Sequence, residues 1–68
     1  MMDNNQLVSI QYNRLIDNRE TPKAFLFSIA GKDVWLPKSC VEDIRETEKV
    51  VDIPFWLAKK KGLETYEA

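Results

Sequence analysis

Apolar and polar positions alternate most clearly over residues 23–30, and this pattern predicts a β-strand. One side of this strand carries three large apolar residues, Phe25, Phe27 and Ile29. Gly31 and Lys32 supply a two-residue turn with glycine first, which is typical of a β-hairpin. In that register Ile29 lies opposite Val34 and Phe27 lies opposite Leu36, so Val34 and Leu36 join the same side. The sequence therefore predicts a hairpin with one core-facing side.

Trp35 falls on the opposite side of this hairpin, across from Ser28. A tryptophan that the local pattern leaves outside the core is either covered by another segment or used to contact a partner. We favour the first alternative, in which another segment covers Trp35, because a chain of 68 residues needs every large aromatic side chain for burial. The simplest cover is the short helix that the sequence predicts near the C-terminus.

Residues 7–16 fit two patterns. Val8, Ile10 and Tyr12 alternate as in a strand. The segment also fits a helical face, made of Val8, Tyr12, Leu15 and Ile16. We favour a strand, because the segment is rich in β-branched and aromatic residues and leads into a turn-rich stretch.

Residues 40–53 leave a second choice open. A helix would have Ser39 as its N-cap, with Glu42 completing a capping box. The alternative is two short strands on either side of the charged turn 45–48. We favour the strands, because residues 49–53 are rich in β-branched side chains and would pair backward as a hairpin.

The last predicted element is a short helix over residues 55–61. Pro54 fits its first position, and three lysines crowd its C-terminal end, where the helix dipole favours cations. Gly62 stands where a left-handed cap is needed, and Leu63 would fold back onto the helix. A helix this short is stable only when it is docked on the rest of the protein.

Together these elements predict one small β domain over residues 7–63, with a flexible N-terminus at 1–6 and a frayed tail at 64–68. We expect a mainly β fold, α+β by element count. Its architecture would be an SH3-like or OB-like bent meander of four to five antiparallel strands with one short C-terminal helix. A chain of this size buries only about 60% of its unfolded surface. Because its core is modest, a homodimer remains an alternative to a monomer.

The side chains that most enzymes and zinc sites require are absent from this sequence. It has no histidine, and Cys40 is its only cysteine, so an internal disulfide is excluded and zinc lacks ligands. Without a histidine to activate it, Cys40 is better interpreted as a small apolar residue than as a nucleophile. The two glycines, Gly31 and Gly62, have structural positions, so there is no phosphate-binding loop. We therefore expect no enzymatic activity and no cofactor.

Charge and hydropathy limit the partners and the location. The net charge of −1 gives no general attraction to nucleic acid or to a membrane. No apolar run approaches the roughly 20 residues that span a bilayer, and residues 1–6 lack the features of a signal peptide. A single unpaired cysteine suits a reducing compartment. We expect a cytoplasmic protein without membrane contact.

Five residues are candidates for contact with a partner: Trp35, Lys38, Trp56, Lys59 and Lys60. The tryptophans would anchor a protein or stack on bases, and the lysines would form a basic patch if the helix packs near the end of the hairpin. The structural alternative is two buried tryptophans beside a solvated helix end, and we favour it for each of these residues.

Two segments resemble small proteins encoded in bacteriophage and prophage genomes. The first comprises the strand 23–27, Gly31 and Val34–Ser39, and the second is Ile53–Leu63. The shared pattern is an aliphatic strand, a W-[LI]-P-K-S segment and a closing P-x-W-L-A-x-x-K-G-L segment, and it covers about residues 23 to 63. The resemblance implies the cytoplasm of an infected bacterium as the setting, and it supplies no catalytic residues.

Two hypotheses for the function follow. The first is an interaction protein that binds a host or phage protein and modulates a host enzyme or defence system, with strand addition at a sheet edge as one binding mode. The alternative is an accessory protein that binds single-stranded nucleic acid in phage replication or recombination. The near-neutral charge counts against this alternative.

Overall fold

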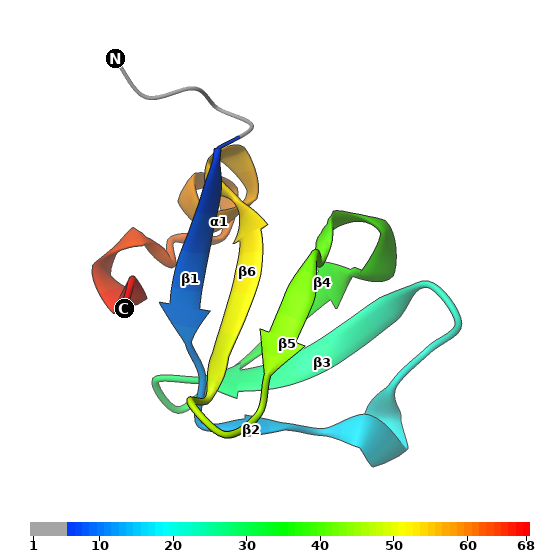
Figure 1. The fold of residues 1–68 in the computed structure, drawn as a ribbon. Coiled ribbons are helices and arrows are strands. Elements are labelled where there is room, and N and C mark those ends of the chain that lie inside the picture. The colour runs from blue at the N-terminus through cyan, green and yellow to red at the C-terminus, as the bar shows by residue number, and fades with distance from the viewer. Residues whose placement is uncertain (1–5) are drawn as a thin grey trace.

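The computed structural model describes residues 6–68, which form six strands in two three-stranded antiparallel sheets and one α-helix (Figure 1). Sheet A has the strand order β1–β6–β5, and sheet B has the order β2–β3–β4. The strands are β1 Leu7–Gln11, β2 Arg14–Leu15, β3 Ala24–Ile29, β4 Lys32–Pro37, β5 Asp43–Arg45 and β6 Val50–Pro54. The predicted mainly β, bent meander with a short C-terminal helix is confirmed. The predicted flexible N-terminus, except for Gln6, lies outside the described residues.

The predicted strand over residues 7–16 is present, but a bend at Tyr12 and Asn13 divides it between the two sheets. The Tyr12 N–H donates to the Lys49 carbonyl, next to β6, at 2.9 Å. The following N–H, of Asn13, donates to the Ser28 carbonyl in β3 at 2.6 Å. Two consecutive amides thus bond to different sheets, and the bent strand appears as both β1 and β2.

The β3–β4 hairpin has the predicted faces but a different register. Its turn residues are Ala30 and Gly31, with φ angles of 53° and 80°, so the turn begins one residue earlier than predicted. Positive φ at both positions gives a twist that suits a two-residue hairpin. The predicted pairings are therefore wrong, and Trp35 lies opposite Leu26 instead of Ser28. Because this shift moves each partner by two positions, every side chain keeps its predicted face.

The core lies between the two sheets, and the predicted apolar side of the hairpin faces it. Phe27, Ile29 and Leu36 are fully buried, and Phe25 and Val34 are half-buried against them. Sheet A and the helix complete the cluster. Its buried members are Val8, Ile10, Tyr12, Phe27, Ile29, Leu36, Val51, Ile53, Leu57, Ala58 and Leu63.

The two strands favoured for residues 40–53 are also present. β5 and β6 pair from Arg45 opposite Val50 to Asp43 opposite Asp52, around the loop 46–49. The helical alternative that begins at Ser39 is limited to one short 3₁₀ helix, η2 Lys38–Cys40, which links β4 to β5. A β-branched strand that pairs along its length with β1, and over residues 50–52 with β5, outweighs a single capping box.

The helix α1, Phe55–Lys61, ends as predicted but begins one residue later. Pro54 is its N-cap and the last residue of β6, rather than the first helical residue. Gly62 has the left-handed φ of 70°, and the Leu63 N–H donates to the Ala58 carbonyl at 2.8 Å. The Gly62 N–H also donates to the Lys59 carbonyl at 3.2 Å, and the two bonds form a Schellman motif that brings Leu63 into the core. The helix packs mainly against β1 and β6.

The C-terminal segment returns to the outer edge of β1, although we expected it to fray. The 3₁₀ helix η3, Glu64–Tyr66, follows α1. Glu67 then forms an antiparallel bridge with Ile10, and the Ala68 N–H donates to the Ser9 carbonyl at 2.8 Å. The tail thus covers part of an edge that would otherwise be open to other strands.

Candidate functional site

The side of sheet B that faces away from the core carries a row of three apolar residues across its strands. The Ile16 N–H donates to the Leu26 carbonyl at 2.8 Å, and Leu26 pairs with Trp35 on the other side. Leu26 is only 1% exposed although it lies outside the core cluster, whereas Trp35 is 38% exposed. Trp35 therefore shields Leu26 and still presents part of its indole to solvent.

The neighbouring row on the same side pairs Ala24 with Pro37, and both are half-buried. The two rows together are termed the Trp35 face, which consists of Ile16, Ala24, Leu26, Trp35 and Pro37. Next to Pro37 lies a hollow of ≈ 450 Å³, lined by Pro22, Lys23, Pro37, Lys38 and Ser39. The face is therefore an apolar strip that continues into a hollow large enough for a side chain.

The free edge of β4 adds backbone groups to this face. β4 is an end strand of sheet B, and the Lys38 N–H donates to the Lys23 carbonyl at 2.8 Å just beyond it. Bonded residues alternate along an antiparallel strand, so Leu36 bonds to β3 whereas Trp35 turns its N–H and C=O outward. Trp35 thus offers an indole on one face and backbone groups at the edge.

Lys38 is held in place by its neighbours. Its Nζ forms an ion pair with the Glu20 carboxylate and lies 5.0 Å from the centroid of the Phe25 ring. Glu20 follows the 3₁₀ helix η1, Asp17–Arg19, in the turn-rich connection to β3. A lysine over an aromatic ring and beside a carboxylate is already neutralised. Lys38 therefore has two contacts within its own chain, the Glu20 carboxylate and the Phe25 ring, at the end of the hairpin.

Trp56, Lys59 and Lys60 lie on α1, which packs on sheet A. Trp56 is 37% exposed, its neighbour Leu57 is buried, and the lysines are exposed. The expectations that both tryptophans are buried and that this helix covers Trp35 are therefore wrong. The reason is that α1 follows β6 without a connecting loop and docks at the end of the same sheet.

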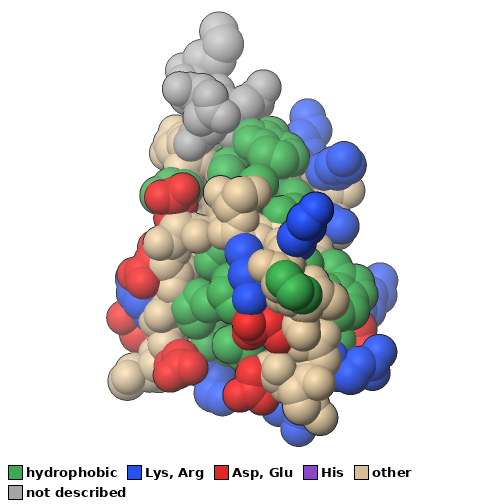
Figure 2. All heavy atoms as spheres, turned by 90° about the vertical axis from the view of Figure 1, so that its right-hand side faces the viewer, with side chains coloured by type: hydrophobic (Ala, Val, Ile, Leu, Met, Phe, Trp, Pro, Cys, Tyr) green, Lys and Arg blue, Asp and Glu red, His purple; other side chains and the backbone are tan. Residues whose placement is uncertain are grey.

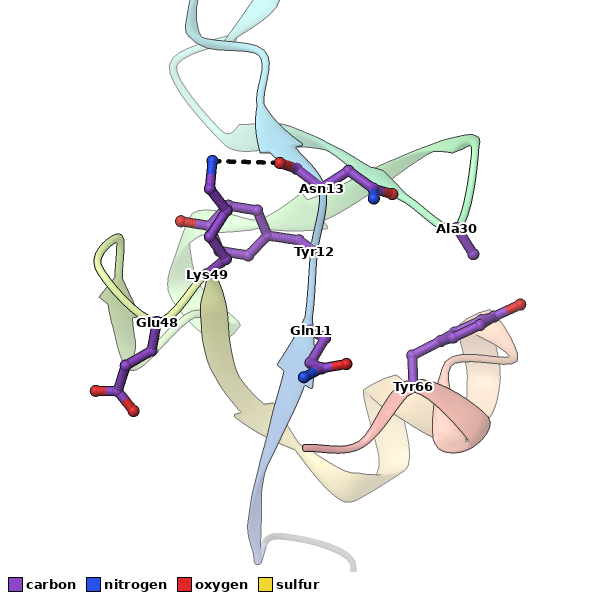
Figure 3. A pocket seen from close by; sticks show the side chains of 7 residues that line it. All are labelled: Gln11, Tyr12, Asn13, Ala30, Glu48, Lys49 and Tyr66. Carbon is purple, nitrogen blue, oxygen red and sulfur yellow. Dashed lines mark hydrogen bonds between the residues drawn. The ribbon is translucent and has the colours of Figure 1, made fainter.

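A second hollow, of ≈ 250 Å³, lies where the bend approaches the hairpin turns (Figure 3). Its lining residues are Gln11, Tyr12, Asn13, Ala30, Glu48, Lys49 and Tyr66. Figure 3 shows Tyr66 on one side of it and Glu48 and Lys49 on the other, and the Lys49 Nζ donates to the Asn13 carbonyl at 3.4 Å. Sequence reasoning missed this hollow, because only the fold brings its separate segments together.

Tyr12 forms the buried wall of this second hollow. Its ring meets that of Phe27 edge-on, with 4.9 Å between the ring centroids. Burial, and to a smaller extent the charge of Glu46, raises the pKa of Tyr12 above its ordinary value of 10.0. The phenol is therefore protonated at neutral pH and does not act as a base there.

The outer side of sheet A carries a polar network instead of an apolar row. The Ser9 hydroxyl donates to the Asp52 carboxylate at 2.5 Å, and Arg45 donates to both side chains at 2.6 and 2.8 Å. Asp52 lies directly opposite Asp43, and Arg45 offsets the repulsion of these like charges. The hydrogen bond to Asp52 raises the pKa of Arg45, so the guanidinium stays charged. The network is therefore explained by its structural role, which is to offset the repulsion between Asp52 and Asp43 within sheet A.

Comparisons of the chain with protein-family models, with curated proteins and with solved structures find no match. The likeness to phage proteins and to SH3-like or OB-like barrels therefore stays a prediction. Within residues 6–68, no three potential metal ligands come together, and no helix combines the length and apolar character that a bilayer span requires. The Trp35 face is the candidate site that the geometry supports best.

Proposed function

We propose that this chain is a non-enzymatic interaction protein, which binds a protein partner through the Trp35 face and the adjoining edge of β4. The observation that carries this proposal is the 38% exposure of Trp35 beside a buried Leu26. A small domain needs its large apolar side chains for its own stability, and tryptophan is enriched among the residues that dominate binding energies. An indole held on a strand also loses little conformational freedom when it is bound.

Strand addition is the binding mode that fits this surface. An extended segment of the partner would bond to the outward backbone groups of Trp35 and lay a side chain against the indole. The hollow beyond Pro37 would accept a further apolar side chain. Main-chain bonds then supply affinity, and the indole and the hollow supply specificity.

The resemblance to phage proteins supports a cellular setting for this activity. The partner would be a host or phage protein in the cytoplasm of an infected bacterium. A small chain without catalytic groups would act there by occupying a surface of its partner, and would in this way modulate a host enzyme or a defence system.

The charges favour a protein over a single-stranded nucleic acid. The net charge is −1, and binding of a phosphate backbone depends on an excess of Lys and Arg. Lys38 is already paired with Glu20, and the lysines of α1 belong to the part of the molecule built on sheet A. The Trp35 face therefore has an aromatic platform without the basic groove that usually accompanies one.

The test is a capture experiment from bacterial lysate with two matched variants of the full chain. Trp35→Ala should lose a specifically captured protein, whereas Trp56→Ala should retain it. Trp56 is a close control, because it is the same residue type with nearly the same exposure, 37% against 38%, on the other sheet.

Folding has to be separated from binding in this experiment. Trp35→Leu keeps an apolar cover over Leu26 and should stay folded by circular dichroism while still losing the partner. Capture that survives Trp35→Leu and disappears with Trp56→Ala would place the binding surface on α1 and overturn the proposal.

A further inference from the structure

The two sheets leave one opening between the end strands β4 and β5. In the strand order β5–β6–β1, continued through the bend by β2–β3–β4, these two strands are not neighbours in either sheet. This opening is termed the seam. A hollow of ≈ 310 Å³ lies in it, lined by Phe25, Lys38, Val41, Glu42, Asp43 and Ile44. Figure 2 shows exposed hydrophobic atoms between acidic and basic groups on this side of the molecule.

The floor of the seam is apolar and incompletely covered. Phe25, Val41 and Ile44 are half-buried and pack against the core cluster. The Phe25 ring also meets Phe27 edge-on, with 6.1 Å between the ring centroids, so the floor is continuous with the core. An apolar side chain placed in the seam would therefore complete the cover of side chains that already pack against the core.

The backbone of β5 is open toward the seam at Ile44. Lys49 and Phe55 bond to Tyr12 and Gln6, the residues on either side of β1, so the alternate residues of β6, such as Asp52, face β5. Asp43 pairs with Asp52 in the ladder, so the backbone N–H and C=O of Asp43 point toward β6. Ile44 consequently directs its N–H and C=O away from β6. Ile44 of β5 and Lys38, the residue that follows β4, thus both line the hollow.

The rim of the seam is acidic on the β5 side. Glu42 and Asp43 are exposed, and neither forms an ion pair within residues 6–68. Among the described residues that line the hollow, Lys38 is the only cation, and it is paired with Glu20. A ligand that crosses this rim therefore gains most if it carries positive charge there.

We infer that the seam takes an extended peptide segment in which apolar and basic side chains alternate. Apolar side chains would contact Phe25, Val41 and Ile44, and basic ones would reach Glu42 and Asp43. This inference rests on the proposed function, because the same segment would run along the edge of β4 beside Trp35. The inference goes further than the proposed function in one respect: it specifies that the partner contributes a basic segment that forms a β-strand.

The probe is a short, terminally blocked peptide of alternating valine and lysine, compared with one of alternating valine and glutamate. Binding is followed by amide NMR shifts of the labelled full chain. The valine–lysine peptide should shift the amides of residues 33–36 and 41–45, and the valine–glutamate peptide should leave them unchanged.

Charge reversal makes the test sharper. Glu42→Lys with Asp43→Lys should weaken the valine–lysine peptide about tenfold and allow the valine–glutamate peptide to bind. The control is Glu64→Lys with Glu67→Lys, which changes the net charge by the same amount outside the seam. Binding that is equal for both peptides, shifts that gather elsewhere, or no shifts at all would overturn the inference.

The two proposals fail in different ways. If the valine–lysine peptide does not shift the seam amides but Trp35→Ala still abolishes protein capture, the seam inference is wrong and the interaction surface stands. If the peptide shifts the seam amides and reverses its preference with the double variant, the seam inference is supported whatever the lysate contains.

Discussion

Trp35 lies directly opposite Leu26 in the β3–β4 ladder, and the two side chains are 38% and 1% exposed. Leu26 is buried without belonging to the main core, so its cover comes from its neighbours on the outer side of sheet B. One indole thus has two tasks: it shields an aliphatic side chain, and it forms the proposed contact surface.

This pairing predicts coupled stability. Leu26→Ala should lower the free energy of unfolding by about 2–4 kcal/mol, and Trp35→Ala by about 1 kcal/mol. In the double variant the losses should fall short of their sum by about 0.5–1 kcal/mol, because each residue loses part of its role without the other. Urea unfolding followed by circular dichroism measures all three values. Strict additivity would show that another segment covers Leu26.

The β3–β4 turn predicts a stabilising substitution. Ala30 has a φ of 53°, a left-handed conformation that is unfavourable for a residue with a Cβ. Ala30→Gly should therefore raise the free energy of unfolding by up to about 1 kcal/mol. Gly31→Ala is the matched control and should lower the free energy of unfolding, because Gly31 has a φ of 80°. An added Cβ would meet no atom within 4 Å, so this loss would come from the backbone conformation alone. Destabilisation by Ala30→Gly would argue against this turn.

The burial of Tyr12 predicts a loss of stability at alkaline pH. Its pKa in the folded protein is raised above 10.0, so the unfolded chain releases this proton first as the pH rises. The contribution of this group is intact below pH 10.0 and declines as the pH rises toward the folded-state pKa. Urea unfolding between neutral and strongly alkaline pH should show this decline. Tyr12→Phe should reduce it, and an unchanged pH profile would contradict the burial of the phenol.

The charge distribution predicts weak interaction with single-stranded nucleic acid. Titration with a mixed-sequence oligonucleotide should leave the tryptophan emission unchanged at low and at high salt. Trp35→Phe and Trp56→Phe isolate the signal of each remaining indole. Quenching that weakens with salt and disappears in Trp35→Phe would instead support the nucleic-acid alternative.

Local patterns predicted those parts of the fold that depend on neighbouring residues. The faces of the hairpin were correct because a register shift of two positions preserves alternation, even though the turn residues were not. Gly62 followed by Leu63 identified the end of the helix. The turn at Ala30 was missed because no local signal favours a left-handed alanine over the Gly31–Lys32 alternative.

The candidate site depended on longer-range geometry. Trp35 was a candidate from the start, but its exposure follows from where α1 docks, and that position is set by β6 pairing with β1. The ion pair of Lys38 with Glu20 was not predicted, and the single basic patch of Lys38 with the lysines of α1 stays a prediction. The seam was not anticipated, because it requires the order of strands in both sheets.

We expect the bend at Tyr12 and Asn13 to influence the width of the seam. These two peptide groups sit midway in the strand order, whereas β4 and β5 stand at its two ends. A small rotation at 12–13 would therefore change the width of the opening on the far side, without altering any residue that lines it. Asn13→Pro, which removes the N–H bonded to Ser28, is accordingly expected to act as a remote modulator of peptide affinity.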